Sequence, residues 1–319
     1  MHRQAVHLRR NKAQSAMEYL MTYGWAILII AIVLAALFSL GVFNPMAYAP
    51  KAPPGACQVF RPNGPGTTFY INLEGICNGE LPQYTMAFSN TSVHGVIVQQ
   101  SPSMSTAWGG GSWTIATWFK ETALLNASTG RDLIEENTGC TSGLWVGSSS
   151  VTQFSVFTIQ WYSSGGACTN EGAVSAGYGG LPYNTWLFVV STFHYNPGNS
   201  WVAICVNGVC NNSTWTSDSP SDYAQYGFTF SINDNDCCSV RSPGGELANV
   251  QLYNTSLSQQ EIQALYREGI GGAPIDLQNL VGWWPLNGNA NDYSGNGNNG
   301  ELNNVVRFDG NWYPDYTPP

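Results

Sequence analysis

Charged side chains are scarce in this sequence. They make up 10% of the 319 residues, with 11 Lys and Arg against 20 Asp and Glu, for a net charge of −9. A basic surface that could bind nucleic-acid phosphates is therefore not expected. Apolar residues reach 43% and aromatic residues 13%, so the chain has enough apolar side chains for one large core or two smaller ones.

Two common site patterns are also missing. None of the 8 cysteines forms a CxxC pair, and the adjacent Cys237 and Cys238 imitate one poorly, so a zinc site is not expected. Beyond residue 13 the only histidines are His94 and His194, and neither is in a recognisable nucleophile context, which argues against Ser-His-Asp catalysis. His194 lies inside an apolar run, where we expect a structural side chain.

A long segment near the N-terminus lacks charge altogether. No charged residue occurs between Glu18 and Lys51, and the apolar run of residues 25–43 is long enough to cross a bilayer core of roughly 30 Å at about 1.5 Å per residue. Basic residues precede this run, which predicts a cytoplasmic N-terminus and an exported body. A cleaved secretory signal is the alternative, with "AYA" at residues 47–49 as the cleavage site, but Pro50 disfavours cutting there.

The residues around Glu18 carry a resemblance. The stretch "KAQSAMEYLMTYGWAILI" is similar to the class III signal peptide of archaeal type IV pilin-like proteins. The resemblance implies cleavage between Ala13 and Gln14, which removes a leader of residues 1–13. It also implies that the hydrophobic helix of residues 14–43 joins a filament, in which Glu18 pairs with the N-terminal amine of a neighbouring subunit. A plain signal anchor is the alternative, but it does not explain a carboxylate at the edge of the apolar run.

The rest of the chain has the composition of an exported β-protein. Residues 44–56 are a proline-rich stalk, and residues 57–82 are a connector that carries cysteines. Short runs that alternate apolar with polar or small residues then recur at the spacing of a β-sandwich. The predicted strands lie at residues 112–120, 154–162, 185–195, 201–210 and 247–254.

Cysteines and sequons both agree with export. All 8 cysteines follow the apolar run, which indicates an oxidising location with disulfides. N-x-S/T triplets, which are acceptors for N-linked glycans in exported chains, begin at Asn90, Asn126, Asn211, Asn212 and Asn254.

One disulfide follows from local geometry. In "CVNGVC" the central Asn-Gly pair favours a type I′ hairpin turn, which places Cys205 opposite Cys210 at a separation compatible with a bridge. Cys57 with Cys77 is a second local pairing. No pairing is predicted for the remaining cysteines, which are Cys140, Cys168, Cys237 and Cys238.

A single helix is well signalled, and it carries a second resemblance. Ser258 is an N-cap with Glu261 three residues later, and Gly269 ends the helix. The stretch "VQLYNTSLSQQEIQALYREG" resembles the closing strand and helix of laminin G-like, concanavalin A-like jelly-roll domains. In that family the opening strand and loop look like "GWWPLNGNANDYSGNGNNG", and in this chain that pattern comes after the helix.

This order implies a circular permutation. The resemblance predicts a mainly β fold in which the N-terminal transmembrane or pilin-like helix is followed by a permuted concanavalin A-like jelly-roll β-sandwich of residues 83–308. Its first strand is supplied by residues 281–286, its second and third strand patterns lie at residues 86–99 and 111–120, and residues 309–319 form a tail. The late strand can close its own domain or fill the gap in a neighbouring subunit. A truncated second domain that starts at Leu280 is disfavoured, because no further strand pattern follows Phe308.

Domains of this family act as lectins, adhesion modules and glucanases. Retaining glycoside hydrolysis needs two carboxyl groups about 5 to 5.5 Å apart, which relatives supply from one strand through an E-x-D-x-x-E pattern. No Glu-x-Asp occurs in this chain, and the adjacent Glu135 and Glu136 are expected to be solvated loop charges. No catalytic residue is therefore predicted.

The loop "NANDYSGNGNNG" is the predicted metal site. Asp292, Asn296 and Asn298 offer oxygen ligands of the kind that calcium prefers, and related jelly rolls often hold calcium near this loop. The alternative is a glycine-asparagine turn that needs left-handed backbone. Asp234 and Asp236 are a second candidate.

Tryptophans supply both the predicted core and the candidates for stacking on sugars. The core candidates are Trp113, Trp118, Trp186 and Trp201. The surface candidates are Trp108, Trp145 and Trp215.

The sequence as a whole predicts a non-enzymatic, pilin-like cell-surface subunit with a lectin-like head for adhesion or glycan binding. Its partners would be the membrane, identical or related subunits and a surface glycan. It would lie in the cell membrane with its body outside, or in an extracellular filament. The alternative is a monomeric membrane-anchored surface lectin or a glycoside hydrolase.

Overall fold

The computed structural model describes only part of the chain. The described residues are 21, 23–35, 82–89, 95–108, 111–122, 131–137, 142–148, 153–162, 172–215, 229–232, 244–303, 306–310, 312, 315–317 and 319. The chain divides into two compact units, Met1–Pro50 and Lys51–Pro319.

In the first unit, residues 21 and 23–35 are helical, inside the predicted helix of residues 14–43. None of the helices within the described ranges combines the length and the apolar character that crossing a membrane requires. The predicted processing site between Ala13 and Gln14 lies outside the described residues, as does Glu18. The membrane-spanning helix therefore stays a prediction.

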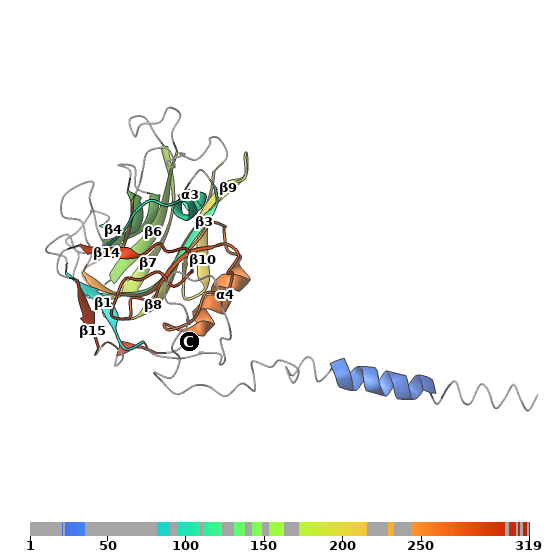
Figure 1. The fold of residues 1–319 in the computed structure, drawn as a ribbon. Coiled ribbons are helices and arrows are strands. Elements are labelled where there is room, and N and C mark those ends of the chain that lie inside the picture. The colour runs from blue at the N-terminus through green and yellow to red at the C-terminus, as the bar shows by residue number, and fades with distance from the viewer. Residues whose placement is uncertain are drawn as a thin grey trace, which may run out of the picture. The chain divides into compact units, whose positions relative to one another are not determined.

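The second unit is a sandwich of two antiparallel sheets (Figure 1). The strands of sheet A are β1 (Thr85–Phe88), β3 (Trp113–Glu121), β8 (Leu187–His194), β9 (Ser200–Val206), β10 (Val209–Trp215), β12 (Gly245–Tyr253), β13 (Leu280–Trp284) and β15 (Arg307–Asp309). The described strands follow the order β10-β9-β8-β3-β12-β1-β15, and β13 also pairs with β12.

Sheet B forms the other layer. Its strands are β2 (Gly95–Val98), β4 (Arg131–Asn137), β5 (Ser142–Ser148), β6 (Gln153–Tyr162), β7 (Gly172–Pro182), β11 (Thr229–Ile232) and β14 (Gly300–Asn303). The described strands follow the order β14-β2-β11-β4-β5-β6-β7. A mainly β sandwich is thus observed, as expected from the alternating runs.

Strand alternation creates two apolar clusters. On β3, Trp113, Ile115 and Phe119 face sheet B and belong to the core between the sheets. The side chains between them face the other way, so Trp118 packs on the outer side of sheet A in a second cluster with Phe188. Sheet A is therefore covered on both faces.

Helix α4 (Gln259–Glu268) supplies part of that outer cover, through Ile262 and Leu265. Its N-terminus has the predicted capping box, because the Ser258 hydroxyl accepts from the Glu261 N–H and the Glu261 carboxylate accepts from the Ser258 N–H. Gly269 ends the helix at φ 79°. The second described helix of this unit is α3 (Pro102–Trp108).

The late strand β13 pairs antiparallel with β12 of the same chain. Both β1 and β13 use one edge of β12: residues 245–247 pair with β1, and residues 250–253 pair with β13. Asn249 lies between the two stretches with a positive φ of 54°. The chain thus closes its own sandwich with a strand that comes after the helix.

Two expectations about strand positions need correction. The pattern at residues 86–99 is two strands rather than one, because β1 belongs to sheet A and β2 to sheet B. The adjacent Glu135 and Glu136 are on β4 rather than in a solvated loop, and the Glu135 side chain is 1% exposed. Pairing of β4 with β5 on one side and β11 on the other encloses this position.

The C-terminal residues assigned to a tail contribute to the fold. Trp312 is 1% exposed, and its Nε1–H donates to the carbonyl of Pro82 at 3.1 Å. One carboxylate oxygen of Asp315 lies 3.2 Å from Nζ of Lys120. The same ammonium group forms an ion pair with Glu246 at 2.6 Å. These contacts hold the C-terminal segment against sheet A.

Tyr316 shows how deeply this segment packs. Its hydroxyl accepts from the N–H of Ile270 at 3.1 Å, in the turn after α4. Burial raises the pKa of Tyr316 to about 12, because the charged phenolate would be poorly solvated there. The hydroxyl therefore stays protonated at all ordinary pH values.

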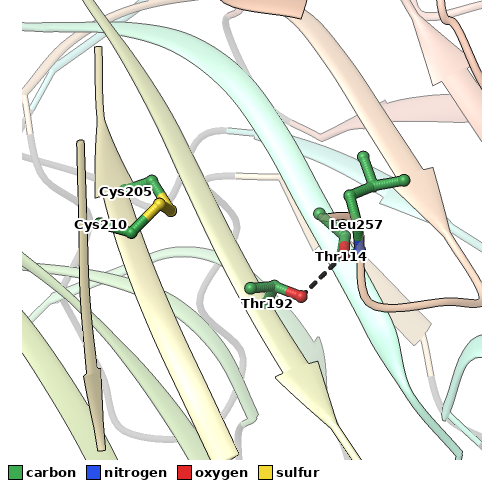
Figure 2. The surroundings of a disulfide bond; sticks show 5 residues. All are labelled: Thr114, Thr192, Cys205, Cys210 and Leu257. Atoms are coloured by element: carbon green, nitrogen blue, oxygen red, sulfur yellow. Dashed lines mark hydrogen bonds between the residues drawn. A yellow bond between two sulfur atoms is a disulfide. The ribbon is translucent and has the colours of Figure 1, made fainter. Parts of the chain in front are cut away.

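The predicted disulfide between Cys205 and Cys210 is present and joins β9 to β10 (Figure 2). The turn residues Asn207 and Gly208 have φ values of 50° and 80°, as a type I′ hairpin requires, and Cys205 is the register partner of Cys210. Cys57, Cys77 and the cysteines without a predicted pairing lie outside the described residues.

Figure 2 also shows Thr114 of β3, whose side chain holds the segment before α4 against sheet A. The Thr114 hydroxyl of β3 accepts from the Leu257 N–H at 3.0 Å and donates to the Thr255 carbonyl at 2.7 Å. It also lies 2.8 Å from the Thr192 hydroxyl of β8. One hydroxyl thus ties two strands to the start of the helix.

We expect the double substitution Cys205→Ala and Cys210→Ala to lower the free energy of unfolding by about 2 kcal/mol, the loop-entropy estimate for a short closed loop. Chemical denaturation of the two proteins measures this difference. Reductant should lower the unfolding midpoint of the wild-type protein by more than it lowers that of the variant. A variant as stable as the wild type would contradict a structural role for the bridge.

Candidate functional site

The loop after β13 brings together the residues predicted to bind calcium. The Asp292 carboxylate is fully buried. Its Oδ1 atom accepts from the N–H groups of Trp283 and Ser294, and its Oδ2 atom accepts from the Ser294 hydroxyl and the Asn298 N–H, all at 2.8 to 2.9 Å. Four donors thus surround one carboxylate.

The two asparagines of the predicted site also face the protein. Asn296 donates its side-chain amide to the carbonyls of Leu280 and Val281, both at 2.9 Å. The Asn298 amide donates to the Val281 carbonyl, and its oxygen accepts from the Ser101 hydroxyl at 2.6 Å. These side chains hold the loop against β13 and against the segment that begins α3.

This arrangement does not fit a calcium ion. A cation needs oxygen lone pairs that converge on one point, whereas here N–H and O–H groups point at both oxygens of Asp292. The turn alternative agrees better, since Gly295 and Gly297 in this loop have φ values of 100° and 76°. Asp234 and Asp236 lie outside the described residues.

We expect Asp292→Asn to lower the free energy of unfolding by about 2 to 4 kcal/mol, because an amide NH₂ would face two donors in a buried position. Asp276→Asn is the matched control, since Asp276 is half-buried and bonds to Asn279 at a surface turn. Urea denaturation measures both variants. Calcium or a chelator should not move the midpoint of the wild-type protein; a calcium-dependent shift would contradict the structural role.

The outer face of sheet B carries a half-buried aromatic pair. On β5 the side chains of Leu144 and Val146 enter the core, so Trp145 between them points outward. Trp145 lies directly opposite Phe157 of β6, and their ring centroids are 6.0 Å apart. The Nε1 atom of Trp145 is buried and has no acceptor among the described residues.

Glycines border this pair. Gly177 of β7 is the register partner of Phe157 on the side away from Trp145, and it is exposed. A Cβ atom added to Gly147 of β5 would lie 3.0 Å from the Phe157 ring. With no side chains at these positions, neither glycine covers the Phe157 ring. Ser155, also partly exposed, is the register partner of Gly147.

Sheet A has a different aromatic pair near its surface. Trp201 was expected in the core, but it is half-buried, and its ring stacks on His194 with the centroids 5.2 Å apart. His194 Nδ1 lies 2.9 Å from the Ser256 hydroxyl, which agrees with a structural histidine. The other tryptophans expected in the core, Trp113, Trp118 and Trp186, are buried.

Sequence reasoning identified Trp145 as a surface candidate but missed Phe157. The available signal was the run "FSVFTIQWY", in which Phe154 and Val156 alternate with Phe157 across the strand. The side chains of Trp108 and Trp215, the other two surface candidates, are outside what the structure describes.

Comparison with known protein families gives one match. The model of the concanavalin A-like lectin/glucanases superfamily matches residues 96–263. A search of curated proteins gave no match.

Solved structures give further likenesses, all of them to the fold alone. A proposed carbohydrate-binding protein from Bacteroides ovatus ATCC 8483 is 18% identical with a TM-score of 0.47, over 72% of this chain and 60% of that one. The chain thus spans less than two thirds of that protein. The SAP-like pentraxin of Limulus polyphemus is 12% identical (TM-score 0.42; 71% and 94% covered). The Ruminococcus gnavus IT-sialidase CBM40 bound to α2,3-sialyllactose is 16% identical (TM-score 0.41; 58% and 97% covered).

Proposed function

Because this chain belongs to the concanavalin A-like lectin/glucanases superfamily, we propose that its sandwich domain binds a glycan without catalysing a reaction on it. The binding site is the outer face of sheet B around Trp145 and Phe157. The observation that carries the proposal is that this aromatic pair is half-buried and bordered by glycines, while sheet A is covered on its outer side by α4 and the C-terminal segment.

The chemistry of this face suits a sugar. A pyranose ring has an apolar C–H face that can pack on a flat aromatic ring, and aromatic side chains contribute a large contact area at low entropic cost. The neighbouring Ser155 and Ser175 are partly or fully exposed and can pair with sugar hydroxyls. The missing side chain at Gly177 lets the sugar approach Phe157 from the edge of the sheet.

A hydrolase is the weaker alternative. The chain lacks the E-x-D-x-x-E pattern that places two carboxyl groups on one strand. Of the buried glutamates, Glu135 is on β4 in sheet B, whereas Glu121 and Glu246 are in sheet A, where Glu246 forms an ion pair with Lys120. On β4, Asp132 is the register partner of Trp145 and Glu135 is the register partner of Gly143, so it is the missing E-x-D-x-x-E pattern that disfavours a hydrolase.

We expect Trp145→Ala to weaken glycan binding at least tenfold, which corresponds to about 1.4 kcal/mol. The assay is an array of neutral and sialylated oligosaccharides, followed by calorimetry on the oligosaccharide that the wild type binds best. Trp201→Ala is the matched control, because it removes a half-buried tryptophan from sheet A. Gly177→Val should also weaken binding, since it adds bulk beside Phe157 without removing any packed side chain.

Thermal melting checks that each variant is folded. Equal affinity in Trp145→Ala and the wild type would exclude this face as the glycan site, as would an equal loss in Trp201→Ala. If the wild type binds no oligosaccharide but self-associates, and Trp145→Ala abolishes that association, the face is a protein interface and the proposal is wrong.

The N-terminal segment gives the second part of the proposal, which is display at the cell surface as a pilin-like subunit. Its support is the sequence pattern of a basic leader, Gln14, Glu18 and an uncharged apolar run. The helix at residues 23–35 is compatible with this use. The sandwich domain would then be held outside the membrane or along a filament. The alternative is a monomeric lectin held by a plain membrane anchor.

We expect the mature protein from its native cell surface to begin at Gln14, as determined by intact mass and N-terminal sequencing. Glu18→Ala should then reduce filament assembly, because a buried N-terminal amine would lose its counter-charge. Under the plain anchor alternative, the same variant should still be displayed. A mature chain that retains Met1, or one that begins at Pro50, would exclude the filament.

A further inference from the structure

Two overlapping sequons lie on the edge strand of sheet A. Asn211 heads Asn-Asn-Ser and Asn212 heads Asn-Ser-Thr, and both are on β10, the last strand in the order of the sheet. Because successive side chains of a strand point to opposite faces, the two asparagines face different surroundings. The sequence alone cannot separate them, but the structure can.

Asn211 points toward the other sheet. It is the register partner of Ile204, whose side chain is in the core between the sheets. Its Nδ2 atom donates to the Gly177 carbonyl on β7 at 3.1 Å, so the amide bridges the edges of the two sheets. A glycan on Asn211 would be attached to a nitrogen atom that already takes part in this contact between β10 and β7.

Asn212 points to the outer side. It is the register partner of the small residue Ala203 and is exposed. Its neighbours along this face are the disulfide-bonded Cys210 and the exposed Thr214. Within the described part of the chain the Asn212 side chain has no hydrogen-bond partner, so its Nδ2 atom is accessible and not engaged.

In the third described sequon the side chain of Asn254 is already engaged in contacts within the fold. Asn254 follows β12, and its side-chain oxygen is buried while its Nδ2 atom donates to the Thr106 hydroxyl at 3.1 Å. Its backbone N–H donates to the Asn279 carbonyl at 2.9 Å, which fixes the residue at the junction with the segment before β13. Asn90 and Asn126 lie outside the described residues.

We infer that Asn212 is a site of N-linked glycosylation. The reaction joins Nδ2 to the anomeric carbon of an oligosaccharide carried on a lipid phosphate; the lipid phosphate leaves and one Nδ2 proton is released. The disulfide next to this position holds β9 and β10 in place, so the acceptor amide is presented at a fixed, exposed point of the fold. The inference rests on the exported location in the proposed function, but not on glycan binding by sheet B.

The overlap of the two sequons provides matched variants. Thr214→Ala removes the hydroxyl that Asn212 requires and leaves the Asn211 sequon intact. Ser213→Ala removes the hydroxyl that Asn211 requires and leaves the Asn212 sequon intact. Both changes are small, and Thr214 is exposed, so neither should disturb the hairpin.

The experiment is peptide mapping by mass spectrometry of the full-length protein from the surface of its native cells. We expect a glycan on the peptide with Asn212, its complete loss in Thr214→Ala and its retention in Ser213→Ala. The Asn254→Gln control should have the same total mass of glycan as the wild type. A glycan lost in Ser213→Ala but kept in Thr214→Ala, or an unmodified peptide in the wild type, would overturn the inference.

The same protein preparations distinguish a failure of the glycosylation inference from a failure of the proposed function. A formed Cys205–Cys210 bridge together with an unmodified Asn212 would mean that the protein reached an oxidising compartment and that the glycan assignment is wrong. Oligosaccharide affinity of Thr214→Ala should equal that of the wild type, because Asn212 is on the outer side of sheet A and Trp145 is on sheet B.

Discussion

The shared edge of β12 is the constraint on which the rest of the sandwich depends. Two segments from opposite ends of the domain, β1 and β13, must pair with the same edge without overlapping. Asn249 makes this possible: its N–H donates to the Pro285 carbonyl, and its side chain contacts the Gly272 carbonyl and the Trp283 Nε1–H at 2.7 and 2.8 Å. One buried amide therefore joins the strand, the turn after α4 and the late strand.

The C-terminal residues have a structural role in sheet A. Two strands that follow α4 complete sheet A: β13 pairs with β12, and β15 pairs with β1. Trp283 of β13 packs in the cluster on the outer side of sheet A, and Trp284 packs in the core between the sheets. One strand therefore contributes to both clusters. The loop after β13 is held by four hydrogen bonds to the buried Asp292 carboxylate.

Local patterns predicted the parts of the fold that depend on neighbouring residues. The capping box at Ser258 and the Asn-Gly hairpin with its disulfide are set by contacts within five positions, and both are present. Long-range pairing decided the rest. The burial of Glu135 depends on strands β5 and β11 on either side, and Phe157 becomes part of a surface only when β5 lies beside β6. A pattern within one segment of sequence does not predict which strands will lie on either side of it.

The position of β1 has a mechanical consequence. This strand is the first described strand of the sandwich, and β12 and β15 flank it on its two sides. The Pro82 carbonyl and the Tyr84 N–H are further tied to Trp312 and Asn287. Tension applied through the N-terminal side would load two ladders of hydrogen bonds together, whereas a tethered edge strand can peel away one bond at a time. Paired on both sides, β1 is thus a strand suited to bearing load.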